Sequence, residues 1–280
     1  MKRFKIEHTT GFKYDREVVA SYNEARMLPE RSDRQTVFSA ALDITPRGSS
    51  HEFTDFFGSH PVMFEVLEPH RELLINAVSV VEVRPTGEAD TTASWDALTV
   101  AAHSDLELTD ASTQTRRTTP PSDLAKFAKK IAAEFGPHET ALRVCKFIFD
   151  SVKYQHGVTG VNSIATEAWS ARVGVCQDFA HLALGALRSV GIPARYVSGY
   201  LHPKLEPEIG DRAVSESHAW IEWFAGEWFG YDPTNDTAIT QRHIVVGHGR
   251  DYDDVPPLRG VYSADCTSEL FVSVHITRTA

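Results

Sequence analysis

Residues 174–180 read GVCQDFA and stand directly before an apolar helical pattern, so Cys176 is expected at the start of a helix. The first turn of a helix offers unpaired N–H groups and a partial positive charge, and both stabilise a thiolate. Gly174 lets the backbone turn tightly just before the thiol. This stretch therefore predicts a reactive cysteine, whose N–H can also donate to a developing oxyanion.

His218 and Asp232 are the partners that such a cysteine needs. His218 follows Cys176 after 42 residues, in a strand-like alternation over 218–224, and Asp232 follows 14 residues later. A hairpin with the three-residue loop 224–226 would place His218 directly opposite Asp232 on one face. A two-residue loop would put Asp232 on the wrong face. The first register predicts a Cys-His-Asp nucleophile system for acyl transfer.

The period of the apolar residues changes along the chain. Residues 1–115 hold short strand-like runs separated by Gly and Pro, which predicts an antiparallel β-sandwich domain. Residues 116–122 are polar and predict a linker, and Ser122 is expected to cap a helix that runs to Phe135. Residues 123–280 show helices first and strands afterwards, which predicts an α+β domain.

Composition narrows the class of protein. The formal charge of −10 argues against a nucleic-acid partner, and no apolar stretch is long enough to span a membrane. Three distant cysteines and an N-terminus without a signal-peptide pattern predict reduced thiols and a cytoplasmic location. Cys145 falls on the apolar face of a helix, where a core residue is expected. His243 and His248 are spaced i, i+5, on opposite strand faces, so neither a metal nor another cofactor is expected.

These motifs together resemble the transglutaminase-like cysteine enzyme superfamily. The resemblance rests on GVCQD at 174–178, HAW at 218–220 and YDPT at 231–234, in the family's order. SYNEAR at 21–26, DFFG at 55–58 and DVPPLRG at 254–260 are similar to bacterial members with an N-terminal β-domain. It implies an α+β, papain-like transglutaminase core, with helices on an antiparallel sheet, preceded by the β-sandwich domain. It also implies Cys176 as nucleophile, His218 as general base and acid, and Asp232 as orienter.

The resemblance leaves the reaction open, because members share the acyl-enzyme and differ in acceptor. We expect hydrolysis of a peptide or amide. The alternatives are amine transfer to glutamine, or a non-catalytic binding module, with a homo-oligomer also open. The expected second oxyanion donors are Tyr154 and Gln177, of which Tyr154 is preferred. The remaining candidates are for the substrate cleft: Trp169, Trp220 and Glu216.

Overall fold

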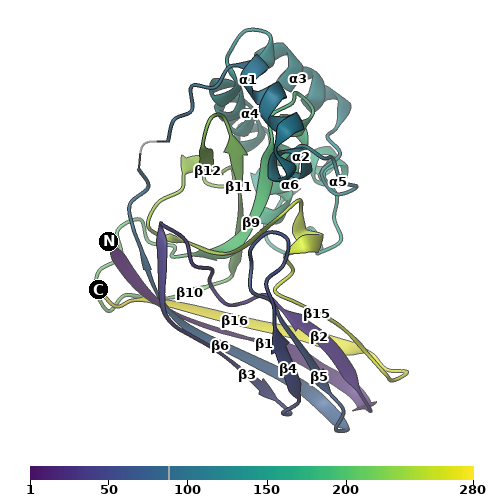
Figure 1. Cartoon of the computed structure of the whole chain (residues 1–280). Coiled ribbons are helices and arrows are strands. Elements are labelled where there is room, and N and C mark those ends of the chain that lie inside the picture. The colour runs from purple at the N-terminus through teal and green to yellow at the C-terminus, as the bar shows by residue number, and fades with distance from the viewer. Residues whose placement is uncertain (88) are drawn as a thin grey trace.

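The molecule is built in layers, as the computed structural model shows for residues 1–87 and 89–280 (Figure 1). A long antiparallel sheet forms the base, and a central antiparallel sheet lies above part of it. Helices cover the upper face of the central sheet, and a small sheet packs on the other end of the base. The prediction of an antiparallel β-region followed by an α+β core is confirmed.

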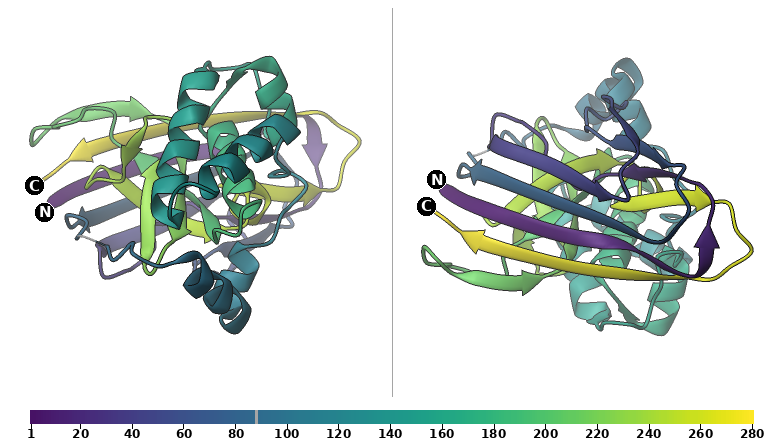
Figure 2. Two further views of the ribbon diagram at one scale, coloured as in Figure 1. Left: turned by 90° about the horizontal axis from the view of Figure 1, so that it is seen from above. Right: turned by 90° about the horizontal axis from the view of Figure 1, so that it is seen from below.

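The long sheet brings the two ends of the chain together. Its strands, in spatial order, are β10 (Arg212–Ser215), β16 (Ser268–Arg278), β1 (Lys2–Val18), β6 (His70–Val83) and β3 (Gln35–Thr45). β16 pairs with β1 along its whole length, from Tyr14↔Ser268 to Phe4↔Arg278. The first and last strands are therefore neighbours, and Figure 2 shows both ends of the chain at one end of this sheet.

The small sheet covers one end of the long sheet. Its strands, in spatial order, are β15 (Leu258–Tyr262), β2 (Ser21–Ala25), β5 (Val62–Val66) and β4 (Ser49–Glu52). Phe64 of β5 lies in one buried apolar cluster with Tyr14 of β1 and Ile75 of β6. This cluster is the core of a β-sandwich, which side chains on alternate positions of facing strands can fill.

The central sheet lies between the helices and the other end of the long sheet. Its strands, in spatial order, are β13 (Thr237–Ala238), β12 (Trp228–Asp232), β11 (Ser217–Phe224), β9 (Ala194–Leu201) and β14 (His243–Gly249). Tyr200 and Ile244 from this sheet join Phe4, Ile6 and Ile276 of the long sheet in a second buried cluster. Both faces of the central sheet are covered, and β9 and β14 are buried along almost their whole length.

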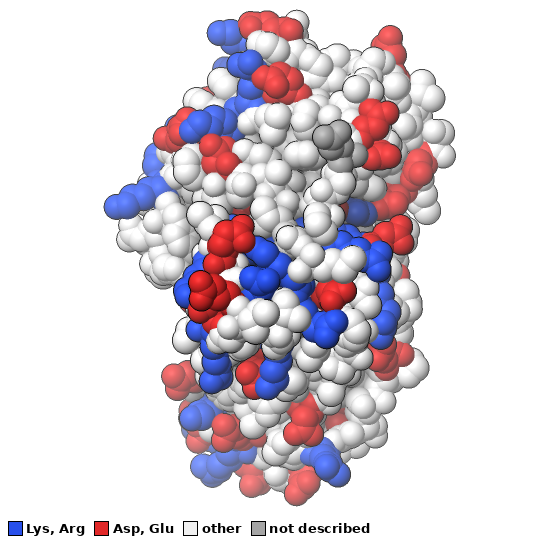
Figure 3. All heavy atoms as spheres, turned by 90° about the vertical axis from the view of Figure 1, so that its left-hand side faces the viewer, with Lys and Arg blue, Asp and Glu red and all other residues white. Residues whose placement is uncertain are grey.

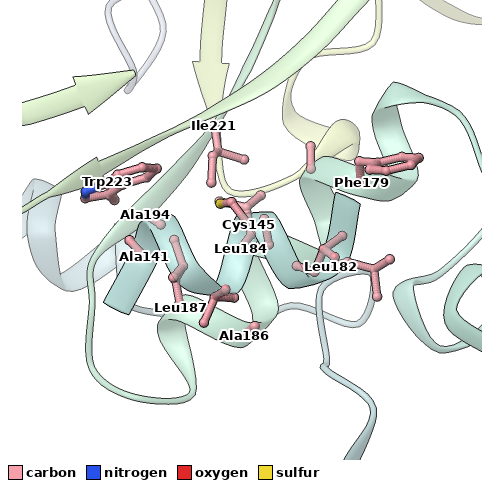
Figure 4. Close-up of a cluster of buried hydrophobic side chains, with 14 of the residues drawn as sticks. Ala141, Cys145, Phe179, Leu182, Leu184, Ala186, Leu187, Ala194, Ile221 and Trp223 are labelled. Atoms are coloured by element: carbon pink, nitrogen blue, oxygen red, sulfur yellow. The ribbon is translucent and has the colours of Figure 1, made fainter. Parts of the chain in front are cut away.

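Among the described residues, six α-helices build the other side of the core. They are α1 (Trp95–Ser104), α2 (Leu106–Ala111), α3 (Ser122–Ala132), α4 (Pro137–Ser151), α5 (Ala165–Ala171) and α6 (Cys176–Arg188), with a 3-10 turn, η1 (Tyr252–Asp254). α6 is the central one, and every residue from Gln177 to Arg188 is buried. Figure 4 shows Leu184 and Leu187 packing with Cys145 in this core, below Ile221 of β11.

The strand pairing corrects the predicted domain boundaries. Residues 258–278, expected in the domain 123–280, instead supply β15 and β16 to the small and long sheets. Residues 95–111, expected within the β-sandwich 1–115, form α1 and α2, and Leu98 of α1 belongs to the helical core. Alternation identifies a strand, but it does not say which sheet the strand joins.

The predicted linker is also wrong. Residues 116–122 include Arg117 and Thr118, which are 8% and 0% exposed, so this segment is part of the helical core. Ser122 does not cap α3, because Pro121 is the N-cap residue. The helix also ends earlier than predicted, at Ala132 rather than Phe135. The proline ring has no atom that could accept a hydrogen bond from the first turn, so α3 begins without a side-chain cap.

Two surface properties complete the description. Within the residues that the structure describes, no helix has the length and apolar character needed to cross a membrane. Figure 3 shows one face of the molecule, on which basic and acidic side chains are interspersed with uncharged surface.

Candidate active site

Cys176 is the first residue of α6, as the sequence predicts. A short strand, β8 (Val173–Gly174), leads into it and pairs in parallel with β7 (Lys153–Tyr154). Residues in the first turn of a helix have no intrahelical partner for their N–H groups. The Cys176 N–H is therefore free to donate to a bound substrate oxygen, and the side chain itself is partly exposed.

Asp178 fixes the backbone around Cys176. Its Oδ2 accepts a hydrogen bond from the Val175 N–H at 2.8 Å and from Thr159 Oγ1 at 2.6 Å, and its Oδ1 accepts from Ser163 Oγ at 2.6 Å. A Cβ on Gly174 would lie 2.7 Å from Asp178 Cβ, so a larger residue would displace this carboxylate. Asp178 thus caps α6 and ties the loop before α5 to the segment that carries the cysteine.

His218 on β11 and Asp232 on β12 are brought together. His218 Nε2 lies 2.7 Å from Asp232 Oδ2. The predicted register is nevertheless wrong by two residues, because Phe224 pairs with Trp228 and the loop is 225–227. A shift of two keeps both side chains on the same face, so they meet diagonally rather than directly across.

The hairpin loop explains the register. Gly226 has a φ of +117°, and a Cβ there would lie 2.7 Å from the carbonyl oxygen of Asp90. Glu227 also donates its N–H to that oxygen at 2.9 Å. A segment 136 residues earlier in the chain therefore holds the loop.

The Asp232 carboxylate is fully hydrogen-bonded in the core, with 0% of the residue exposed. Its Oδ1 accepts from the Thr234 N–H at 3.0 Å and the Asn235 N–H at 3.2 Å, and its Oδ2 accepts from Asn235 Nδ2 at 2.7 Å. These bonds come from the turn that follows β12. They fix the plane of the carboxylate and leave Oδ2 directed at His218.

His243 on β14 is a further partner of Asp232 that the sequence did not reveal. It is 0% exposed, and its Nε2 lies 3.3 Å from Asp232 Oδ2. Its Nδ1 accepts a hydrogen bond from the Thr240 N–H at 3.0 Å, so the proton is on Nε2 and points to the carboxylate. Only the fold could show this contact, because β14 lies on the far side of β9 from β11.

The charges of the three buried groups follow from these contacts. Burial disfavours the imidazolium of His218, but Asp232 and then Cys176 outweigh it and raise the pKa of His218 to about 10. Burial also disfavours the carboxylate of Asp232, but His218 and His243 hold its pKa well below the usual range. Burial lowers the pKa of His243. At neutral pH His218 is charged, Asp232 is ionised and His243 is neutral.

The same three residues are the metal-ligand group found among the described residues. The ligand atoms of His218, Asp232 and His243 lie within 4.8 Å of one another. Two imidazoles and a carboxylate are ligands that suit a transition metal. Each of these atoms already has a hydrogen-bond partner in the cluster, which accounts for the arrangement without an ion.

A cavity of about 890 Å³ opens beside His218. Tyr154 and Glu216 line it, together with Val272 and Ser273 from β16 of the long sheet. Glu216, which was expected at the substrate cleft, is therefore in the wall of this cavity. The cleft is therefore formed between the central sheet and the long sheet, on the side where β10 ends.

Trp169 and Trp220 do not line this cavity, and their assignment to the cleft is wrong. Trp169 is 4% exposed, and its Nε1 donates to the Asp123 carboxylate at 2.9 Å in the helical core. Trp220 is 0% exposed and meets the ring of His243 edge-on, with centroids 5.3 Å apart. Trp220 packs beneath the site and does not contact the cavity.

The two predicted oxyanion donors differ in their surroundings. Gln177 is 8% exposed, and its Nε2 donates to the Val161 carbonyl at 3.3 Å. Tyr154 is 41% exposed and lies next to β8 and the cavity. Burial, and then the nearby Cys176, raise the pKa of Tyr154 to about 12. Its hydroxyl thus keeps its proton and can donate it in a hydrogen bond at neutral pH.

The other two cysteines lie away from this constellation. Cys145 is 0% exposed in the helical core, where burial raises the pKa of its thiol well above the ordinary value. Cys266 packs against the core of the β-sandwich. The prediction that Cys145 is a core residue is confirmed.

Comparison with known proteins assigns the family. Residues 4–82 match the bacterial transglutaminase-like N-terminal region, and residues 125–233 match the transglutaminase-like superfamily. An uncharacterized protein of Mycobacterium leprae is 40% identical over 281 aligned residues, which cover 100% of each chain. The chain belongs to the transglutaminase-like superfamily.

Two further comparisons bear on fold and chemistry. A candidate cysteine protease of Cytophaga hutchinsonii superimposes with a TM-score of 0.76 at 20% identity, covering 99% of this chain and 98% of that chain. This likeness confirms the fold. A stretch covering 29% of this chain and 13% of the relative is 34% identical to a protein-glutamine gamma-glutamyltransferase of Pseudomonas aeruginosa.

Proposed function

We propose that this protein is a cysteine-dependent acyl-transfer enzyme that hydrolyses an amide bond. The observation that carries the proposal is the constellation at the end of the cavity: Cys176 starts a helix beside His218, and His218 Nε2 lies 2.7 Å from a fully hydrogen-bonded Asp232. Acyl transfer needs a nucleophile, a proton carrier and a group that orients the carrier. These three roles fit Cys176 on α6, His218 on β11 and Asp232 on β12.

The reaction follows from the charges. Asp232 holds Nε2 of His218, which leaves Nδ1 for the sulfur of Cys176, and a charged imidazole beside a sulfur favours the thiolate. The thiolate attacks the amide carbonyl and forms a bond from sulfur to carbon. The carbon–nitrogen bond then breaks, and His218 gives its proton to the leaving amine. The acyl acceptor then transfers a proton to His218 and attacks the carbonyl carbon of the thioester. The carbon–sulfur bond breaks, and the thiolate of Cys176 is released.

Two donors support the negative charge on the substrate oxygen. The Cys176 N–H lies at the N-terminus of α6, whose dipole favours an anion. We assign the second bond to the Tyr154 hydroxyl, which stays protonated at neutral pH and lines the cavity. Gln177 is less suitable, because its amide already bonds to Val161.

Water is the acceptor that we favour, because the cavity is large and partly polar, and water needs no binding site of its own. The alternative is a primary amine. It is favoured by the short stretch of 34% identity to the protein-glutamine gamma-glutamyltransferase of Pseudomonas aeruginosa. Both reactions pass through the same thioester on Cys176.

Mass spectrometry of a peptide library, with and without a primary amine, tests the proposal. Hydrolysis converts a glutamine to glutamate or creates a new chain end, whereas transfer adds the amine to the peptide. Cys176→Ala should abolish either product. Cys266→Ser is the matched control, because Cys266 lies in the β-sandwich, and it should keep full activity. Full activity of Cys176→Ala would refute the proposal.

A further inference from the structure

β16 has a partner along only part of one edge. β1 pairs with all of β16 on one side, but β10 pairs only with residues 274–277 on the other. Across residues 1–87 and 89–280, no strand pairs with residues 268–273 on the β10 side. We call this segment the open edge of β16. It begins where the chain leaves β10 at Ser215 and turns towards His218 on β11.

Backbone hydrogen-bonding groups point outward from the open edge. Arg278 donates its N–H to the Asp211 carbonyl and accepts from the Gly210 N–H, so its backbone groups face the β10 side. Directions alternate along an antiparallel strand. The backbone groups of Val272 and Leu270 must therefore face the same side, where no strand meets them. Such an unpaired edge is a template for another extended chain.

The side chains of the open edge suit an apolar ligand. Leu270 and Val272 are 52% and 51% exposed. They share a strand face with Val274 and Ile276, which are 0% exposed beneath the central sheet. The apolar face of the long sheet thus continues past the part that the central sheet covers. It reaches the cavity beside His218, where Val272 and Ser273 form part of the lining.

We propose that the substrate is an extended peptide segment that adds to the open edge of β16 as a further strand. Its main chain would pair with Val272 and Leu270, and its apolar side chains would occupy the cavity. The carbonyl that follows would then lie between Tyr154 and His218, which line the same cavity. The inference deepens the proposed acyl transfer, because it names the substrate class of that site as unfolded or loop-forming peptide with alternating apolar residues.

Val272→Pro is the variant that separates a loss of main-chain pairing with the peptide from a loss of the protein's own fold. Proline lacks an N–H and is tolerated where that N–H faces away from the ladder, as the Val272 N–H does. Val272→Thr keeps the N–H and replaces an apolar methyl by a hydroxyl. Val261→Thr is the matched control, because Val261 is also an exposed strand residue, at 69%, but lies on β15.

Binding is measured with fluorescein-labelled octapeptides of alternating Val and Thr, in the Cys176→Ala background so that no turnover occurs. We expect Val272→Pro to weaken binding by about 2- to 12-fold, the effect of one lost hydrogen bond. Octapeptides methylated on the alternate nitrogens that would face β16 should also bind more weakly to the Cys176→Ala protein that retains Val272, and adding Val261→Thr to that protein should leave binding unchanged.

Two results would overturn the inference: octapeptides that do not bind, or equal binding by Val272→Pro with an unchanged unfolding midpoint. The proposed function is tested apart from this, by turnover in the protein that retains Cys176. Binding that depends on Val272, without turnover of any peptide, would refute the acyl transfer but support peptide binding at the open edge of β16.

Discussion

The ion pairs of His248 predict how stability depends on pH. His248 Nε2 lies 3.2 Å from Glu222 Oε2, and its Nδ1 lies 3.2 Å from Glu30 Oε2. The three side chains are 9%, 11% and 12% exposed. Burial and then Arg195 disfavour the imidazolium, but Glu222 and Glu30 outweigh them and raise the pKa of His248 to about 9. The cluster connects the central sheet to the segment after β2.

The size of the effect follows from the change in pKa between the unfolded and folded states. A rise from 6.5 to about 9 corresponds to at most about 3 kcal/mol of stability. Because the folded-state pKa is the higher one, this contribution is fully present below pH 6.5. It is lost as the pH rises through 9, where the folded protein also gives up the proton.

Urea unfolding from pH 6 to pH 10 measures the effect in the unmodified protein and in His248→Gln. The free energy of unfolding should fall more steeply with pH in the unmodified protein, and the difference between the two should shrink by about 3 kcal/mol. The His218 contribution is common to both proteins and cancels. The exposed His51→Gln is the control and should follow the unmodified protein. Two curves that stay parallel from pH 6 to pH 10 would refute the reasoning.

Three other predictions concern the site. Asp232→Asn should lower kcat by about 10⁴-fold and bring the pKa of His218 down from about 10, read from the alkaline limb of the pH–rate profile, whereas Asp236→Asn should change kcat little. His243→Leu should lower the free energy of unfolding in urea by about 1–3 kcal/mol and shift the acid limb of the pH–rate profile to higher pH. His243→Gln should restore part of the stability and part of the pH shift. Gly174→Ala should destabilise the protein by about 1–3 kcal/mol, because its Cβ would collide with Asp178. Gly160→Ala, with open space around it, is the control for circular dichroism melting.

Local periodicity was enough to place the main parts of the site. The apolar spacing after Cys176 predicts α6, and alternation over 218–224 predicts β11 within one residue of its observed bounds. A register shift of two leaves a side chain on the same face, so the contact between His218 and Asp232 survives an incorrect loop. Face was predictable from sequence, whereas register was not.

The rest depends on contacts between distant segments. The hairpin loop is held by Asp90, the third partner of the site is His243 on another strand, and the cavity wall is completed by Val272. None of these residues carries a local signal for its role. Trp169 and Trp220 show the converse, since aromatic residues near motif positions suggested a cleft but fill the core.

The pairing of β16 with β1 has a consequence for the order in which the chain folds. Residues 2–18 are made long before residues 268–278, yet one side of β1 meets its partner only when residues 268–278 have left the ribosome. Until then, an incomplete chain also lacks Val272 and Ser273, two residues of the cavity wall. Completion of the long sheet and of the cleft is thus one late event, and a nascent chain that already contains Cys176, His218 and Asp232 cannot yet form the whole binding site.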